Sequence, residues 1–322
     1  MNNRPNLWAF GAFIAGLLVP VLSCAALMIA AGFALGQMGS GVSGLPSSGV
    51  TVGAGPGVAL ISVEGTITSG SATPFTTGVA ASDDILDEIK KAKDDREAKA
   101  ILLKVNSPGG GAVASDEIYH ALKGAGKPIV VVMGDLAASG GYYISMAGDW
   151  IIANPNTLTG SIGVISAFPN AQRMLDKVGV EIVTIKSGPA KDTGSPFREM
   201  TDAEQARWQS LIDEVYSGFV QVVVDGRHMT EGDVRKLADG SVYTGKQALE
   251  LGLVDALGYE EDAIAKAAEL GGITGKPRII KYHRQPTLFD VLNSAASSRS
   301  LLPTPKEVSD WLGWPTISFV YR

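Results

Sequence analysis

The sequence predicts an α/β fold built around a parallel sheet, and three observations support this prediction. Short apolar runs, typical of strands buried on both faces, recur through the middle of the 322-residue chain. Amphipathic stretches with helical spacing separate these runs, so strands and helices alternate as in βαβ units with right-handed crossovers. The chain length and an apolar content of 45% are sufficient for a large buried core.

The predicted elements follow one another in a regular order. The predicted strands are 58–63, 100–105, 128–132, 150–153 and 181–185. The predicted helices are 83–93 (with Ser82 as its cap), 114–123, a short helix through Tyr142 and Tyr143, 171–178, and a long helix from 202 to about 226. The pattern Thr201 to Glu204 is a capping box that opens the long helix, and two shorter helices begin in the same way after Thr230 and Thr244.

The N-terminal residues predict a membrane anchor. Residues 7–35 carry no charge, and at ~1.5 Å per residue such a helix exceeds the ~30 Å core of a bilayer. Arg4 is the positive side chain nearby, so we expect residues 1–6 inside the cell and the rest of the chain outside the cytoplasmic (inner) membrane. Two alternatives stay open, a cleaved signal peptide and a lipoprotein site at Cys24. The length of the apolar run favours an uncleaved anchor.

The rest of the chain divides into a tether, a folded domain and a tail. Residues 36–57 are uncharged and rich in Gly, Ser and Pro, as in flexible linkers. Residues 58–277 hold the predicted elements. Residues 278–322 mix prolines with aromatic side chains and could pack on the core, touch the membrane or serve as an assembly arm.

Composition excludes several function classes. A net charge of −6 offers no basic surface for nucleic acid. Cys24 is the single cysteine, which excludes an intrachain disulfide and a cysteine-based metal site. The glycine-rich stretches match neither G-x-G-x-x-G nor the phosphate-binding P-loop. We expect no metal and no cofactor.

A serine between small residues follows the apolar run 128–132. Ser139 lies in Ala137-Ala138-Ser139-Gly140-Gly141, which predicts a tight turn from a strand into a helix. Such a turn places the hydroxyl at a helix N-terminus among exposed backbone N–H groups. Nucleophile elbows are built in this way, although the G-x-S-x-G pattern of lipases is absent. The alternative interpretation is an ordinary serine N-cap.

A nucleophilic serine needs a base, and lysine is a better candidate here than histidine. The histidines His120, His228 and His283 show no pattern of a Ser–His–Asp triad. Lys186 and Lys191 lie in a Gly- and Pro-rich loop after a predicted strand. Either could accept the serine proton if its pKa fell by several units from ~10.4. The ordinary role of a lysine is a solvated surface charge.

Backbone donors for an oxyanion are expected at three glycines. Gly109 and Gly110 follow a predicted strand and a proline, where the backbone can approach a ligand closely. The N–H of Gly140, next to the candidate nucleophile, is the third.

Four ordered motifs resemble the signal peptide peptidase A family, the membrane-anchored serine–lysine proteases of the Clp protease/crotonase superfamily. They are Asn106-Ser107-Pro108-Gly109-Gly110, Ala138 to Tyr143, Thr159-Gly160-Ser161-Ile162-Gly163-Val164, and the stretch from Lys186 to Pro196. The resemblance covers about residues 58–270. It implies a spiral of repeated βαβ units of the Clp protease/crotonase type.

The resemblance also implies a role for each matching residue. Ser139 matches the nucleophile and Lys191, rather than Lys186, matches the general base. Ser161 matches the serine that hydrogen-bonds to this lysine, and Gly109 and Gly110 match the oxyanion loop.

The family's double-length members draw the serine and the lysine from different halves, and this chain is single-length. The resemblance therefore implies a ring-shaped homo-oligomer in which Lys191 serves the Ser139 of a neighbour. The implied function is a membrane-anchored endopeptidase that cleaves remnant signal peptides and other apolar peptides outside the cytoplasmic membrane. The alternatives are a non-catalytic oligomeric scaffold or regulator and a crotonase-type acyl-CoA enzyme. Export argues against the latter, because coenzyme A is cytoplasmic.

Overall fold

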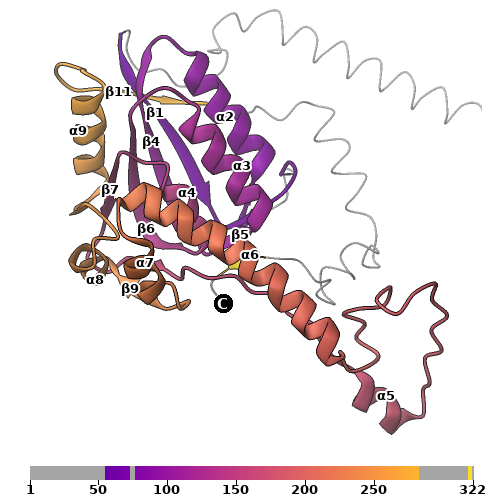
Figure 1. Cartoon of the computed structure of the whole chain (residues 1–322). Helices are drawn as coiled ribbons and strands as arrows, with labels where there is room; N and C mark the ends of the chain where they lie inside the picture. Colours follow the sequence, from indigo (N-terminus) through magenta and orange to yellow (C-terminus); the bar gives the residue numbers. More distant parts are fainter. Residues whose placement is uncertain (1–54, 73–76, 283–317, 321–322) are drawn as a thin grey trace, which may run out of the picture. The chain divides into compact units, whose positions relative to one another are not determined.

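The computed structural model describes residues 55–72, 77–282 and 318–320 (Figure 1). The predicted anchor, residues 7–35, lies outside these ranges, as does most of the predicted tether. Within the described ranges, no helix has both the length and the apolar character needed to cross a bilayer.

A parallel sheet forms the centre of the fold, which confirms the predicted α/β class. Its strand order is β10 (Ala256–Leu257), β7 (Trp150–Ala153), β6 (Ile129–Ala138), β4 (Ala98–Ser107), β1 (Gly57–Glu64) and β11 (Arg278–Lys281). Every neighbouring pair in this order is parallel. The end of β6 also pairs with β8 (Leu158–Gly160), and β9 (Val242–Thr244) runs antiparallel to β8.

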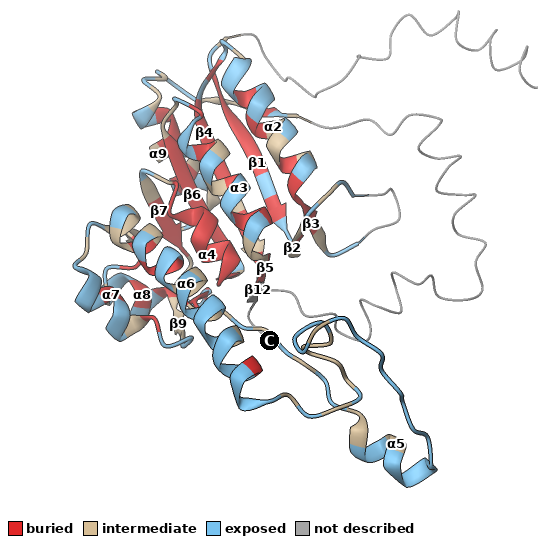
Figure 2. Cartoon of the chain, turned by 45° about the vertical axis from the view of Figure 1, so that its right-hand side comes forward, coloured by how far each residue is buried: buried red, intermediate tan, exposed pale blue. Residues whose placement is uncertain are grey.

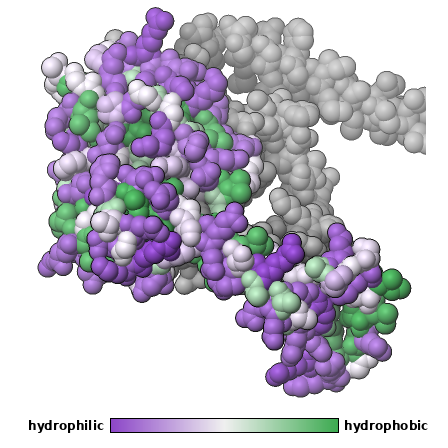
Figure 3. All heavy atoms as spheres, viewed as in Figure 1, coloured by the Kyte–Doolittle hydropathy of each residue, from purple (hydrophilic) through white to green (hydrophobic). Residues whose placement is uncertain are grey.

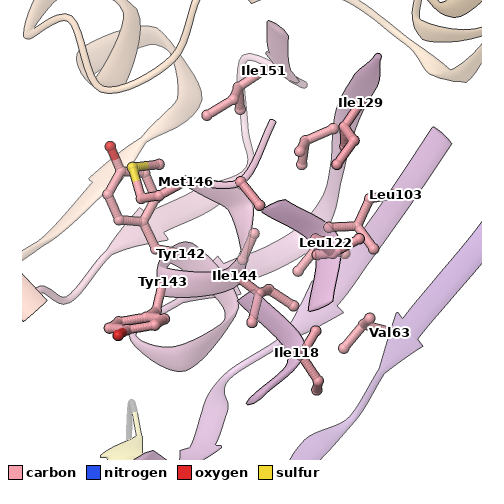
Figure 4. Close-up of a cluster of buried hydrophobic side chains, with 14 of the residues drawn as sticks. Val63, Leu103, Ile118, Leu122, Ile129, Tyr142, Tyr143, Ile144, Met146 and Ile151 are labelled. Atoms are coloured by element: carbon pink, nitrogen blue, oxygen red, sulfur yellow. The ribbon is translucent and has the colours of Figure 1, made fainter. Parts of the chain in front are cut away.

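Helices cover both faces of this sheet, as a parallel sheet requires (Figure 2). One face packs against α2 (Ser82–Asp94), α3 (Ala112–Lys123), α4 (Gly140–Ser145) and part of α6 (Asp202–Arg227). The other face packs against α9 (Glu260–Leu270) through Ala263 and Ala267. Figure 4 shows how apolar side chains from the central strands, α3 and α4 gather on the first of these faces around Ile144, which is fully buried. Burial of apolar side chains on both faces therefore fixes the strand that carries the candidate nucleophile.

A second, small sheet lies at the end of the central strands. Its order is β12 (Ser318–Val320), β5 (Gly109–Gly111), β2 (Thr66–Thr68) and β3 (Val79–Ala81). β12 pairs antiparallel with β5, with Phe319 opposite Gly110. Three further helices, α5 (Gln172–Val178), α7 (Glu231–Leu237) and α8 (Gly245–Glu250), complete the described elements.

Two local predictions are wrong. Residues 181–185 form no strand: the side chain of Ile185 is 96% exposed and that of Val183 is 78% exposed, so this apolar run lacks a partner strand among the described residues. The helix predicted from Asp83 begins at Ser82, and its N-cap is Ala81 rather than Ser82. Residues 278–281 begin the tail for which the sequence left three roles open, and they pack on the core, because they pair as β11 with β1 and extend the central sheet.

Candidate active site

Ser139 occupies a strained backbone position between β6 and α4. Its φ and ψ are 55° and −116°, and it is the N-cap residue of α4. Such angles cost about 1–3 kcal/mol and persist only where the surroundings impose them. Two hydrogen bonds do so: the Ser139 N–H donates to the carbonyl of Gly160 (2.8 Å), and the Ser139 carbonyl accepts from the N–H of Tyr143 (2.8 Å). The turn predicted from the small residues is therefore present, although β6 extends to Ala138 before it begins.

The glycine after Ser139 allows the backbone of β5 to come close. A Cβ on Gly140 would lie 3.1 Å from the Cα of Gly109, 3.1 Å from the nitrogen of Gly110 and 2.6 Å from Oγ of Ser115. A side chain there would displace Ser115 and crowd the backbone of β5. The three glycines predicted as oxyanion donors are thus neighbours in the fold, beside Ser139.

The β5 loop has its own internal hydrogen bonds. Ser107 Oγ donates to the carbonyl of Gly65 (2.6 Å) and accepts from the N–H of Gly109 (3.0 Å). Gly109 has a φ of 94°, a conformation that favours glycine. With the Gly109 N–H engaged in this way, the backbone N–H groups of Gly110 and Gly140 are the better candidate donors. Sequence reasoning missed Ser107, which lies inside the first motif and has no chemical signature of its own.

Tyrosine side chains fix α4 to the rest of the domain. Tyr142 is fully buried and donates from its hydroxyl to the carbonyl of Leu253 (2.8 Å), and burial raises the pKa of this phenol. The Tyr143 hydroxyl donates to Asp116 Oδ1 (2.7 Å), and burial together with this carboxylate raises the pKa of Tyr143. The ring of Tyr143 packs edge-on against Phe219 of α6, with centroids 5.1 Å apart. These contacts hold the helix that follows Ser139.

Ser161 lies next to Ser139 across the β6–β8 pair. Ala138 is the register partner of Gly160, which places Ser161 beside the elbow. Ser161 is 7% exposed and also has a positive φ (50°), and its N–H donates to the carbonyl of Ser241 (2.7 Å). A cavity of about 480 Å³ opens next to it, and Val164, Tyr216 and Asp213 contribute to the lining.

The lysine loop lies on a different part of the domain. Lys191 is exposed, and among the described residues its ammonium makes no ion pair. Lys186 pairs with Asp192 (Nζ–Oδ1 2.6 Å), and Asp192 also binds Arg198, which in turn binds Glu204 at the start of α6. Sequence reasoning singled out neither Arg198 nor Glu204 as part of a site.

Neither candidate lysine contacts Ser139 within the described chain. The loop of Lys191 is attached to the first turn of α6 through Glu204, whereas Phe219 of the same helix packs against Tyr143 near the elbow. At ~1.5 Å per residue, the helix between Glu204 and Phe219 is ~22 Å long. Figure 1 shows α5 and the adjoining loop beyond this N-terminal end of α6. A lysine side chain reaches only ~6 Å, as its five single bonds allow.

The histidines that are described offer no base either. His120 lies in the last turn of α3 and His228 is the C-cap residue of α6, in a left-handed conformation. Neither hydrogen-bonds to Ser139 in the part of the chain that the structure covers. His283 lies outside that part. Among the described residues, a Ser–His–Asp site therefore has no geometric support.

The sequence was compared with known proteins. The family model described as peptidase family S49 matches residues 121–274, which include Ser139, Ser161 and Lys191. A putative protease of Synechocystis is 49% identical over 185 residues, which is 57% of this chain and 67% of the relative. Protease 4 of Salmonella typhi is 36% identical over 81% of this chain and 42% of its own length. A putative signal peptide peptidase SppA of Enterococcus faecium is 40% identical over 71% of this chain and 67% of its own. The chain thus spans between about two fifths and two thirds of these relatives.

Proposed function

Because the chain belongs to peptidase family S49, the signal peptide peptidase A family, we propose that it is a serine endopeptidase with Ser139 as its nucleophile. The family is one of proteases, so the reaction class is peptide-bond hydrolysis. The observation that carries the proposal is the strained, buried position of Ser139, whose neighbour Gly140 lies against the backbone of Gly109 and Gly110. An ordinary N-cap serine bonds to its own helix, whereas Ser139 makes no side-chain cap hydrogen bond.

The proposed chemistry uses a Ser–Lys dyad. Neutral Lys191 accepts the proton of the Ser139 hydroxyl as Oγ bonds to the substrate carbonyl carbon, and it returns that proton to the leaving amine as the peptide C–N bond breaks. The acyl group is then an ester on Ser139 Oγ. A water that gives a proton to Lys191 attacks this ester, the C–Oγ bond breaks, and the proton passes from the lysine to Ser139 Oγ. Ser161 hydrogen-bonds to the lysine and orients it. The negative charge that develops on the carbonyl oxygen is stabilised by the backbone N–H groups of Gly110 in β5 and of Gly140 at the start of α4.

We propose that an extended peptide binds along β5 in the place that β12 occupies in this structure. A strand that adds to a sheet edge satisfies its backbone groups by pairing, and side-chain pockets then select the sequence. β12 pairs with β5 in this way, with Val320 opposite Gly109, which supports the proposal that this edge accepts an extended chain. The substrates we propose are remnant signal peptides and other apolar peptides. The Enterococcus relative is named a putative signal peptide peptidase, which is consistent with this class.

We further propose a ring-shaped homo-oligomer in which Lys191 of one copy serves Ser139 of the next. Two observations support this. The length of α6 separates Lys191 from Ser139 within one chain, as described above. Large apolar side chains of the segment around α5 are exposed, and Figure 3 shows such side chains gathered there. They are Ile165, Met174, Val178, Val180, Ile182, Val183, Ile185 and Phe197.

A second copy is the occupant that would cover this apolar segment. Monomeric soluble proteins rarely leave such a contiguous surface open. A heterologous interface with rotational closure gives a ring, and each interface then contributes one site. The cavity beside Ser161 is where we propose that a neighbour's lysine enters to contact this serine.

The location we propose is the outer face of the cytoplasmic membrane. Residues 7–35 would anchor the chain in the bilayer with the N-terminus inside, on the sequence argument given above. Signal peptides released from exported proteins would then reach the domain from the same membrane.

Covalent labelling tests the proposal. A fluorophosphonate probe is added to the full-length chain in detergent micelles, and the labelled residue is located by mass spectrometry. We expect label on Ser139, none on a Ser139→Ala variant, and normal label on Ser145→Ala, whose hydroxyl donates to a carbonyl inside α4. A folded chain that takes no label, and cleaves no apolar peptide, would contradict the proposal and favour the scaffold.

A further inference from the structure

One arginine joins two carboxylates on either side of the lysine loop. Arg198 binds Asp192 through Nε (3.0 Å to Oδ2) and Nη2 (2.7 Å to Oδ1). The same guanidinium binds Glu204 through Nη1 (2.8 Å to Oε2) and Nη2 (2.6 Å to Oε1). Such two-pronged contacts are geometrically specific and stronger than neutral hydrogen bonds. We name Arg198, Asp192, Glu204 and Lys186 the Arg198 clamp.

The clamp holds the backbone on the C-terminal side of Lys191. Asp192 is the next residue, and its carbonyl accepts from Arg198 Nη2 (3.1 Å) and from the N–H of Ser195 (3.0 Å). The hydroxyl of Thr193 lies within hydrogen-bond distance of Glu204 Oε1 (2.9 Å). Glu204 is itself part of the capping box with Thr201, which begins α6. The loop is therefore tied to the end of a 26-residue helix.

The clamp also accounts for the charge next to Lys191. Arg198 and then Lys186 hold the pKa of the Asp192 carboxyl well below its usual range, and Arg198 does the same for Glu204. The two cations and two anions of the clamp cancel. A free carboxylate beside a lysine would favour the charged ammonium, which cannot accept a proton from serine.

Two other carboxylates, Glu199 and Asp202, lie near the loop in the chain. Glu199 lies 3.8 Å from Arg173 of α5 (Oε1–Nη2), and the pair is largely exposed. Asp202 lies in the first turn of α6, where the helix dipole favours an acid. Asp192 is the carboxylate that directly follows Lys191 in the chain, so it is the one whose charge matters most for this lysine.

We propose that Arg198 is a positioning residue for the base: it fixes the Lys191 loop on α6 and keeps the Asp192 carboxylate from pairing with the Lys191 ammonium. The proposal rests on the proposed Ser–Lys function and deepens it, because it names what keeps the lysine available as a base. It also gives Lys186 a role as a charge partner rather than as an alternative base.

The pH profile of peptide cleavage tests this role. In the full-length enzyme, Arg198→Gln removes the partner of Asp192 Oδ2, while Lys186 stays on Oδ1. The freed oxygen can pair with Lys191, so the pH at which kcat/KM is half-maximal rises by about one unit or more. At a pH below that midpoint the rate falls about tenfold or more, whereas above it the rate approaches the wild-type value. The double variant Asp192→Asn/Arg198→Gln removes the freed carboxylate and restores the midpoint. Arg198→Lys keeps the positive charge but loses the two-pronged contacts, so its midpoint lies between those of the wild type and Arg198→Gln.

Two comparisons keep the outcomes separate. Lys90→Gln neutralises an exposed lysine that pairs with Asp94 on α2, and it leaves the midpoint unchanged. An Arg198→Gln enzyme whose rate falls equally at every pH, with no rescue by the double variant, would overturn the inference and leave a purely structural clamp. If Lys191→Ala keeps wild-type activity, the proposed Ser–Lys function itself has failed.

Discussion

The serine side and the lysine side of the candidate site are held by opposite means. Ser139 and its neighbouring glycines are almost entirely buried, at the end of a strand packed between two helical layers. Lys191 lies on an exposed loop whose main attachments are ion pairs with one helix end. One side is preorganised by the core of its own chain. The lysine side is the one that we propose a second copy completes.

This comparison predicts that the two sides respond differently to substitution. Lys191→Ala should lower peptide cleavage ~10³-fold or more, as expected for the loss of a general base together with its orientation. Thermal stability should stay within ~0.5 kcal/mol of wild type, because the side chain is exposed and unpaired in the described structure. Lys191→Arg should be equally inactive, since arginine stays charged. Cleavage rates and melting temperatures of the variants, measured beside the wild type, check this. An active Lys191→Ala would show that another residue is the base.

A substitution on the serine side should lower both activity and stability. Gly140→Ala places a Cβ 2.6 Å from Ser115 Oγ and against β5, so we expect a loss of about 1–3 kcal/mol and at least tenfold slower cleavage. The matched control is Gly218→Ala on the exposed part of α6, where a Cβ meets nothing within 4 Å. That change should stabilise the protein by about 0.5–1 kcal/mol. Denaturant unfolding measures both. If the two substitutions changed the free energy of unfolding and the cleavage rate equally, tight packing at Gly140 would be contradicted.

The sequence predicted the serine side more completely than the lysine side, for physical reasons. The Ser139 turn is local: small residues after a buried strand are sufficient to indicate it. The clamp depends on Arg198 reaching both Asp192 and Glu204, and nothing in the spacing of these residues distinguishes them from solvated charges. Likewise, the pairing of β12 with β5 joins segments far apart in the chain.

The wrong prediction of a strand at 181–185 has a related cause. Its apolar and β-branched side chains fit a strand, but strands form only where a neighbouring strand or a covering layer is present. Within the described chain there is none. The pattern was therefore a poor guide to secondary structure, and the proposed second copy would account for its apolar side chains.

A smaller effect follows from the pKa values of the clamp. Asp192 and Glu204 have folded-state pKa values below their ordinary 3.8 and 4.5, so the stability they contribute is present above those values and is lost as the pH falls through the lower folded values. Acidification below about pH 4.5 should therefore loosen residues 186–199 before it affects β6. Hydrogen exchange by mass spectrometry at pH values from 7 down to 3, with rates corrected for intrinsic pH dependence, measures this. Simultaneous loosening of β6 and the loop would contradict it.

The most direct test of the central claim is complementation between two inactive chains. Full-length Ser139→Ala and Lys191→Ala are co-expressed with different affinity tags, and assemblies carrying both tags are purified in detergent and assayed on an apolar peptide. If sites are shared across an interface, a random one-to-one mixture recovers up to about a quarter of wild-type activity, because one interface in four combines an intact serine with an intact lysine. Each variant alone stays inactive. Mixed assemblies that form and remain inactive would contradict the account.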